Sequence, residues 1–216
     1  MTVSTKDLRE LPEIPRLRRL MRSLAMLDAI VSPEWDYRYY SFNSAWAEAE
    51  AMASMRNGSG DYWFALFCCD GVAIHGLAHE APVFRPGQPW SGIFDQLPKQ
   101  FHGNFLREPA FTTQDSTFCL WRLNDDDRWS FGPVDLPPGD DPDGSAGLLS
   151  ILAGRPEQYV EFARDYYERD IAVDDVKEVF AHRPLHAALL KNLNPELELD
   201  ALAEDIAEIG YPERAG

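Results

Sequence analysis

The sequence has few cysteines and no long apolar run. Its 216 residues include three cysteines, Cys68, Cys69 and Cys119, and an odd number in a chain of this length is typical of a reducing compartment. No uncharged apolar stretch approaches the roughly 18 residues that a membrane span needs. The first 20 residues also contain no apolar core of signal-peptide length. We therefore expect a soluble, cytoplasmic protein that does not bind membranes.

Several motifs of catalysis and nucleotide binding are also missing. The sequence contains neither the phosphate loop G-x-x-x-x-G-K-[ST] nor the dinucleotide fingerprint G-x-G-x-x-G. The hydrolase nucleophile elbow G-x-S-x-G needs a glycine two positions before its serine, and two positions before Ser145 the chain has Asp143. His182 and His186 have the helical spacing of metal ligands, but Pro184 between them favours a helix boundary. We predict neither a metal nor another cofactor.

Acidic side chains are present in large excess. The chain has 36 Asp and Glu against 20 Lys and Arg, a formal net charge of −16, so nucleic acid is not an expected partner. Residues 133–216 hold 19 acidic and 7 basic side chains, a net of −12, whereas residues 1–132 hold 17 and 13, a net of −4. The excess is therefore concentrated in the C-terminal region.

Apolar patterning and turn signals predict an α+β fold, in which hairpins build an antiparallel sheet with flanking helices. The charge-free run at 62–69 (YWFALFCC) indicates a strand buried on both faces, so its two cysteines are expected in the core. Asp70-Gly71 is a strong hairpin signal. Strands are expected at 37–42, 62–69, 72–78, 117–123 and 128–131.

Helices are predicted before and between these strands. Apolar residues recur at spacings of three and four over 15–31, which is one stripe of a helix. The Ala-rich and Glu-rich segment 44–55 (SAWAEAEAMASM) also favours a helix. Residues 81–116 contain five prolines and are expected to be mostly connection, with one helix over 96–106.

The C-terminal third is predicted to be helical. The breaker-rich stretch 133–145 is expected to form an acidic loop or linker. We favour one domain over 1–216, in which the helical residues 146–216 pack on the mixed α and β residues 1–132, because short helices need a surface to pack against. The expected C-terminal helices are 146–152, 156–169, 173–182, 184–193 and 195–209.

Two regions are candidates for function. The last predicted helix has six acidic side chains and no basic one, and we predict that it binds a basic partner, with an ordinary solubilising surface as the alternative. The other candidate is a pocket beside the polar loop 56–61. The acidic residues are Glu196, Glu198, Asp200, Glu204, Asp205 and Glu208; the pocket residues are Trp46, Glu48, Arg56, Asn57 and Asp61.

The only dense basic cluster lies on the predicted helix 15–31. Arg16, Arg18, Arg19 and Arg22 stand on the face opposite its apolar stripe. Such a cluster is either a docking site for an anion or a solvated helix face, and the sequence leaves both interpretations open.

The block Tyr39–Phe67, with the later Trp90-Ser91-Gly92-Ile93 and Leu97-Pro98, resembles uncharacterised acidic bacterial proteins. It is also similar, over a portion of its length, to the SUKH superfamily of intracellular immunity proteins. In that family a Trp and an Ile precede a Leu-Pro pair, and a glycine-bearing turn follows it; here the Asn57-Gly58 turn comes first. The resemblance implies a protein that binds and neutralises a secreted toxin, often a nuclease, and it assigns no residues.

These observations favour a binding protein over an enzyme. We expect a cytoplasmic protein-binding module, of the type of an immunity protein, that inhibits a basic toxin or nuclease domain through the acidic C-terminal region. The alternative is a small hydrolase that uses the pocket around Arg56, Asn57 and Asp61. The oligomeric state cannot be inferred from the sequence.

Overall fold

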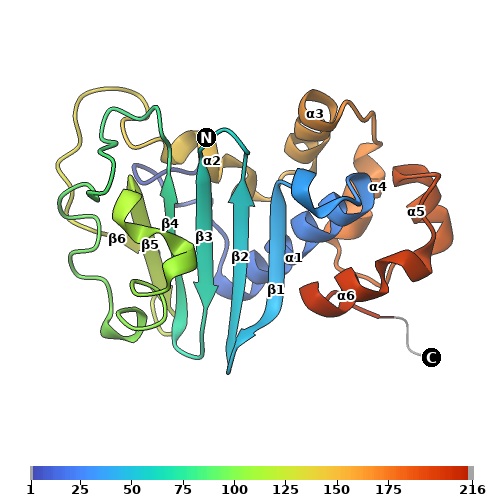
Figure 1. The fold of residues 1–216 in the computed structure, drawn as a ribbon, viewed down its shortest axis with the longest axis horizontal. Coiled ribbons are helices and arrows are strands. Elements are labelled where there is room, and N and C mark those ends of the chain that lie inside the picture. The colour runs from blue at the N-terminus through green and yellow to red at the C-terminus, as the bar shows by residue number, and fades with distance from the viewer. Residues whose placement is uncertain (1, 214–216) are drawn as a thin grey trace.

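The computed structural model describes residues 2–213 and has the predicted α+β fold, with a six-stranded antiparallel sheet (Figure 1). The strands pair in chain order, each antiparallel to the next. Hairpins therefore build most of the sheet, as the turn signals predict, and the long connection 78–117 joins β4 to β5. The strands are β1 (Tyr40–Ala47), β2 (Glu50–Arg56), β3 (Tyr62–Phe67), β4 (Gly71–Leu77), β5 (Phe118–Leu123) and β6 (Ser130–Phe131).

One long helix precedes the sheet and shorter ones follow it. Among the described residues no helix has both the length and the apolarity to cross a bilayer. The α-helices are α1 (Ile14–Val31), α2 (Ser145–Leu149), α3 (Pro156–Tyr167), α4 (Val173–Phe180), α5 (Ala187–Leu193) and α6 (Ala203–Ile209). The 3-10 helices are η1 (Trp35–Tyr37), η2 (Lys99–Phe101), η3 (Pro109–Phe111), η4 (Thr113–Asp115), η5 (Ser150–Ala153) and η6 (Leu199–Leu202).

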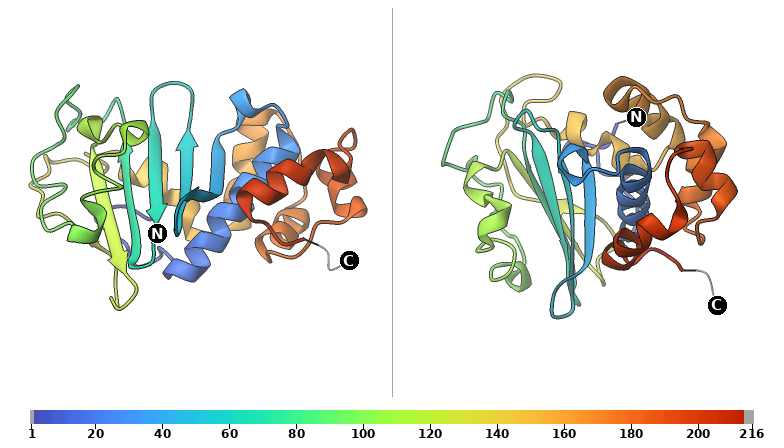
Figure 2. Two further views of the ribbon diagram at one scale, coloured as in Figure 1. Left: turned by 60° about the horizontal axis from the view of Figure 1, so that its bottom comes forward. Right: turned by 45° about the vertical axis from the view of Figure 1, so that its right-hand side comes forward.

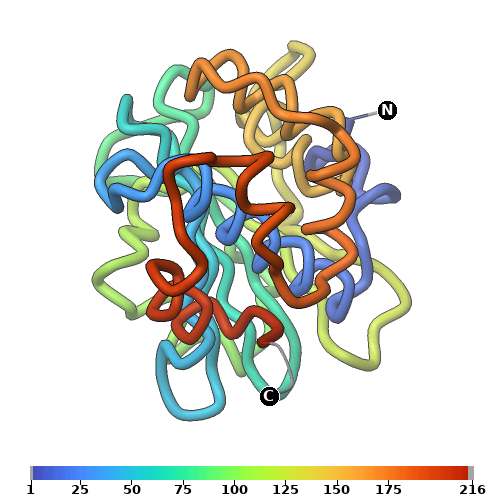
Figure 3. The backbone as a smooth tube through the Cα atoms, turned by 90° about the vertical axis from the view of Figure 1, so that its right-hand side faces the viewer, coloured from blue at the N-terminus to red at the C-terminus, as the bar shows by residue number. Residues whose placement is uncertain are grey.

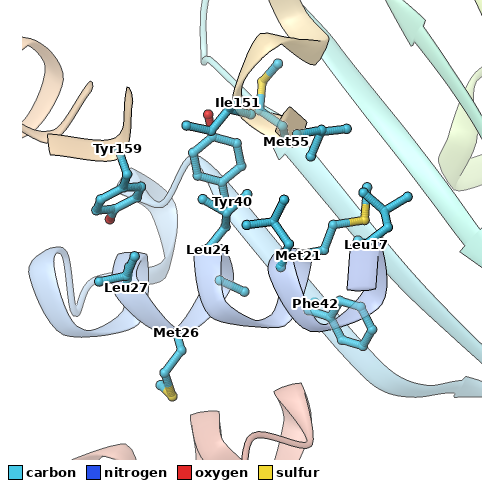
Figure 4. Packing of buried hydrophobic residues seen from close by; sticks show 14 of the residues in the cluster. Leu17, Met21, Leu24, Met26, Leu27, Tyr40, Phe42, Met55, Ile151 and Tyr159 are labelled. Atoms are coloured by element: carbon cyan, nitrogen blue, oxygen red, sulfur yellow. The ribbon is translucent and has the colours of Figure 1, made fainter. Parts of the chain in front are cut away.

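The apolar stripe of α1 packs against one face of the sheet. Leu17, Met21 and Leu24 are almost fully buried and lie beside Phe42 and Met55 of the first hairpin (Figure 4). The helices from α3 to α6 extend the same cluster of buried residues. Figure 3 shows the segment from α4 to α6 lying across α1. The helical third and the N-terminal region thus contribute to one cluster of buried residues.

Residues 81–116 cover the opposite face of the sheet (Figure 2, right). The predicted helix over 96–106 is wrong, because only the short 3-10 turn η2 forms there. Phe101, Phe105 and Phe111 are fully buried and, with Phe64 and Trp121 of the sheet, form a second core cluster. The proline-rich connection is therefore a layer of the fold.

The predicted helix over 44–55 is also wrong, because this segment forms the end of β1, a tight turn and β2. Residues 51–55 are all buried, since β2 lies between β1 and β3 and is covered on both faces. Its alanines and methionines are helix formers by local propensity, but here they fill a crowded strand. Tertiary context overrides local helix propensity.

Smaller corrections concern the ends of elements. β3 ends at Phe67, so Cys69 is exposed in the following turn and is not a core residue. α5 begins at Ala187, three residues after Pro184, and the last helix consists of η6 followed by α6. Asn194 does not cap that last helix; its side-chain amide donates a hydrogen bond to the Ile30 carbonyl at the end of α1.

Candidate functional site

A buried carboxylate on α1 fixes the start of β1. Asp28 is fully buried, and its Oδ2 accepts hydrogen bonds from the amides of Tyr39 and Tyr40 at 2.8 and 2.7 Å. The hydroxyls of Tyr159 and Tyr167 on α3 donate to the same carboxylate at 2.7 and 2.8 Å. Burial raises the pKa of Asp28 to about 6, although these four donors oppose the rise. Asp28 thereby joins α1, β1 and α3.

Beside this junction lies a cavity of about 250 Å³, the aromatic pocket. Its lining includes Ser41 and Ser54, whose hydroxyls are 2.6 Å apart across β1 and β2. Tyr166 packs edge to face against Tyr39, with ring centroids 4.8 Å apart. The lining residues are Trp35, Asp36, Arg38, Tyr39, Ser41, Ser54, Arg56, Gly58 and Tyr166.

Two walls of the aromatic pocket are exposed aromatic side chains. Trp35 is 50% exposed, Tyr166 is 44% exposed, and Tyr37 in the same 3-10 turn as Trp35 is 62% exposed. Phe131 on β6 is the other exposed large hydrophobic side chain of the described residues. Tryptophan and tyrosine contribute most of the binding energy in many protein interfaces. This gathering therefore marks a candidate contact surface.

Arg38 connects the aromatic pocket to the acidic C-terminal segment. Its guanidinium forms an ion pair with Asp205 of α6 and donates to the carbonyls of Ser32 and Pro33. The Arg38 side chain is only 8% exposed, and its guanidinium carbon lies 5.6 Å from the centre of the Trp35 ring. The ion pair fixes α6 next to the pocket.

The six predicted acidic residues do not all play the same role. Asp205 is partly buried and forms an ion pair with Arg38, so its main role is structural. Glu208 accepts a hydrogen bond from Asn43 of β1 at 3.4 Å but stays exposed. The four others are exposed: Glu196, Glu198, Asp200 and Glu204. We call the five exposed residues the acidic rim.

The predicted alternative pocket is divided between two ends of the first hairpin. Arg56 lines the aromatic pocket, and Asn57 and Asp61 form the adjoining loop. Trp46 and Glu48 lie at the other end, because Trp46 is near the end of β1 and Glu48 is in the turn between β1 and β2. Trp46 stacks on Phe111 and lines a separate cleft. The structure does not bring the five residues together.

The loop 56–61 is held rigid by its own side chains. Asn57 Oδ1 accepts from the amides of Ser59 and Asp61, and its Nδ2 donates to Asp61 Oδ2 at 2.8 Å. Asp61 Oδ1 accepts from the amide of His79 and lies 2.7 Å from its Nδ1. Asp61 therefore orients an imidazole that remains partly exposed.

We expect the His79 pKa to lie above its ordinary value of 6.5, because the hydrogen bond to Asp61 favours the protonated ring. This pair stabilises the fold below the unfolded-state pKa, and its contribution disappears as the pH rises through the folded-state pKa. NMR titration of the ring measures the shift. Asp61→Asn is expected to lower the pKa, and an unchanged titration in that variant would refute the pairing.

The acidic loop 133–145 uses its carboxylates within the fold. Asp141 accepts from the amides of Ala146 and Gly147 at the start of α2. Asp143 accepts from the Ser145 amide and hydroxyl, and from the hydroxyl of Thr5 near the N-terminus. Within residues 2–213, no three His, Cys, Asp or Glu side chains are grouped closely enough to hold a metal ion.

Sequence reasoning missed Trp35, Arg38, Tyr39 and Tyr166. Their signal is local: the stretch 35–40 (WDYRYY) and the pair Tyr166-Tyr167 are dense in aromatic residues outside any apolar run. Aromatic side chains at such polar positions are candidates for contact surfaces.

Comparisons with protein-family models, with curated proteins and with solved structures find no match to this chain.

Proposed function

We propose that this chain is a protein-binding module whose partner is a basic protein. The observation that carries the proposal is that the Arg38–Asp205 ion pair holds α6, with Glu204 and Glu208 of the acidic rim, next to the aromatic pocket. Exposed Trp and Tyr side chains supply affinity once they are desolvated. The exposed carboxylates accelerate the encounter with a basic partner.

An immunity-type role gives this module a specific task, namely the neutralisation of a basic toxin or nuclease domain. The net charge of −12 in residues 133–216 supports a basic partner. The partial resemblance of Tyr39–Phe67 to SUKH immunity proteins supports a toxin as the class of partner. The same block contributes four residues to the aromatic pocket, namely Tyr39, Ser41, Ser54 and Arg56.

The first test is affinity capture of the tagged protein from its source cells at low salt, followed by elution along a salt gradient. We expect one stoichiometric basic protein that is released by salt. Capture of only acidic proteins, or of a partner insensitive to salt, would contradict the proposed recognition.

Reversing the charge of the rim is expected to slow association with that captured partner. Glu204→Lys with Glu208→Lys changes two exposed carboxylates and leaves Asp205 paired with Arg38. We expect the association rate to fall by roughly tenfold and its salt dependence to weaken. Stopped-flow or surface-based kinetics at two ionic strengths measures both quantities.

The matched control reverses two exposed acids in the turn between β5 and β6, Asp125→Lys with Asp127→Lys. It changes the net charge by the same amount. Equal slowing in both variants would mean that net charge, rather than the acidic rim, drives association.

A second candidate function is hydrolysis, which the Asp61–His79 pair favours. We propose it as the alternative because Asp61 fixes the Nδ1 side of the imidazole and leaves Nε2 available as a general base. His79→Gln would then abolish turnover of a substrate found by screening while the variant still unfolds cooperatively. Retained turnover in this variant would exclude His79 as the base.

A further inference from the structure

Four arginines on α1 lie outside the protein-binding surface. Arg16 and Arg19 are exposed, whereas Arg18 and Arg22 are partly buried beside the sheet. Within the described region of the chain, none of them forms an ion pair with a carboxylate, although the chain has 36 acidic residues. Like charges on successive helical turns repel one another. We call these four residues the arginine face; within residues 2–213 they form no ion pair, and the acidic side chains that share a cleft with Arg16 are Glu10 and Glu13.

Two of these arginines are fixed in place by aromatic rings. The guanidinium carbon of Arg18 lies 5.6 Å from the centre of the Phe67 ring, and that of Arg22 lies 5.1 Å from the centre of the Phe42 ring. The Nε atoms of both are buried with no hydrogen-bond partner. Burial lowers the pKa of both side chains. A partly desolvated, immobilised guanidinium binds an anion more strongly than a flexible one in water.

The other two arginines line a cleft of about 480 Å³ between α1 and the end of α4. No carboxylate lines this cleft, whose remaining residues are Leu20, Gly154, Phe180, Ala181 and His182. The pKa of His182 is lowered to about 4, first by burial and then by Arg22 and Arg19. His182 is therefore neutral at pH 7, and it lines the same cleft as Arg16 and Arg19.

We propose that the arginine face of α1 binds a small anion that carries two or more phosphate groups. Guanidinium groups match phosphate oxygens with paired hydrogen bonds. Arg16 and Arg19 line the cleft one helical turn apart, a rise of about 4.5 Å, so their two guanidinium groups can engage neighbouring phosphates of a short chain. The volume of the cleft is within the range of small-molecule sites.

Calorimetric titration with inorganic triphosphate and, separately, with ATP tests this proposal, both at low salt and with the metal removed by chelator. We expect saturable 1:1 binding at least about tenfold tighter than that of inorganic monophosphate. Tighter binding of ATP than of triphosphate identifies a nucleotide as the ligand, and equal binding identifies the phosphate chain alone. Absence of saturable binding of both probes overturns the proposal.

Arg16→Gln with Arg19→Gln is expected to weaken triphosphate binding by at least about tenfold. The matched control, Arg85→Gln with Arg107→Gln, removes the same charge from two positions on the segment that covers the other face of the sheet. Circular dichroism checks that both variants fold, and the His182 ring resonances should shift with ligand in the wild type. Equal weakening in both variants would overturn the assignment of this site.

Discussion

Asp28→Ala is expected to cost about 4 kcal/mol of unfolding free energy, because it leaves several buried donors without their acceptor. The amides of Tyr39 and Tyr40 and the hydroxyls of Tyr159 and Tyr167 all donate to this carboxylate. A typical domain is stable by only about 5–15 kcal/mol. Urea unfolding measures the loss, and the junction of α1, β1 and α3 should open first in hydrogen exchange.

The same carboxylate has a distinctive pH dependence. Its folded-state pKa of about 6 exceeds the ordinary value of 3.8, so the folded protein binds the proton more tightly than the unfolded chain does. The stabilisation from that proton is complete below about pH 3.8 and is lost as the pH rises through about 6.

Comparison with Asp28→Asn isolates this effect from other titrating groups. The stability of the wild type relative to this variant should fall between about pH 4 and about pH 6, by on the order of 3 kcal/mol. Tyr159→Phe is the milder control, because it removes one donor and should cost about 1 kcal/mol. A stability difference between the wild type and Asp28→Asn that does not change with pH would contradict the assigned protonation.

Trp35→Ala is expected to weaken binding of the basic partner by about 2 kcal/mol or more, which is roughly 30-fold in Kd. Trp35 is half exposed and forms a wall of the aromatic pocket. A partner that covers it removes the exposed part of the ring from water, and this burial contributes to the binding free energy. Tyr166→Ala should act in the same direction. Calorimetry or surface-based binding with the captured partner measures the change.

Phe131→Ala provides the control for that prediction. Phe131 is 43% exposed, similar to Tyr166, but it lies on β6 at the opposite edge of the sheet. It should leave the Kd unchanged, and all three variants should keep nearly the wild-type melting temperature. Weakening by Phe131→Ala as large as that by Trp35→Ala would place the contact surface elsewhere.

The sheet could be predicted where the chain gives a local signal. The uncharged run at 62–69 and the Asp70-Gly71 turn predict β3 and β4 correctly, since a strand buried on both faces must be apolar throughout. β2 gives no such signal, because its alanines and methionines are also good helix formers. Its strand conformation depends on pairing with β3, which a local pattern does not encode.

The same reasoning explains how far the candidate site can be predicted. The acidic C-terminal residues can be recognised from the composition. Four of the six are exposed, and among the described residues their side chains form no hydrogen bond or ion pair. The pairing of Asp205 with Arg38 could not be predicted, because 167 positions separate them in sequence. The aromatic pocket likewise combines η1, the first hairpin and α3, which are distant in sequence and are joined at the Asp28 junction.

The most direct test of the proposed function is site-specific crosslinking in the source cells. A photoreactive amino acid replaces Tyr37, which is 62% exposed beside the aromatic pocket, and in a second strain it replaces Phe131. We predict that one basic protein is crosslinked from Tyr37 and not from Phe131, and that Glu204→Lys with Glu208→Lys reduces the yield. The same proteins crosslinked from both positions, or none from the Tyr37 position, would contradict the proposed function.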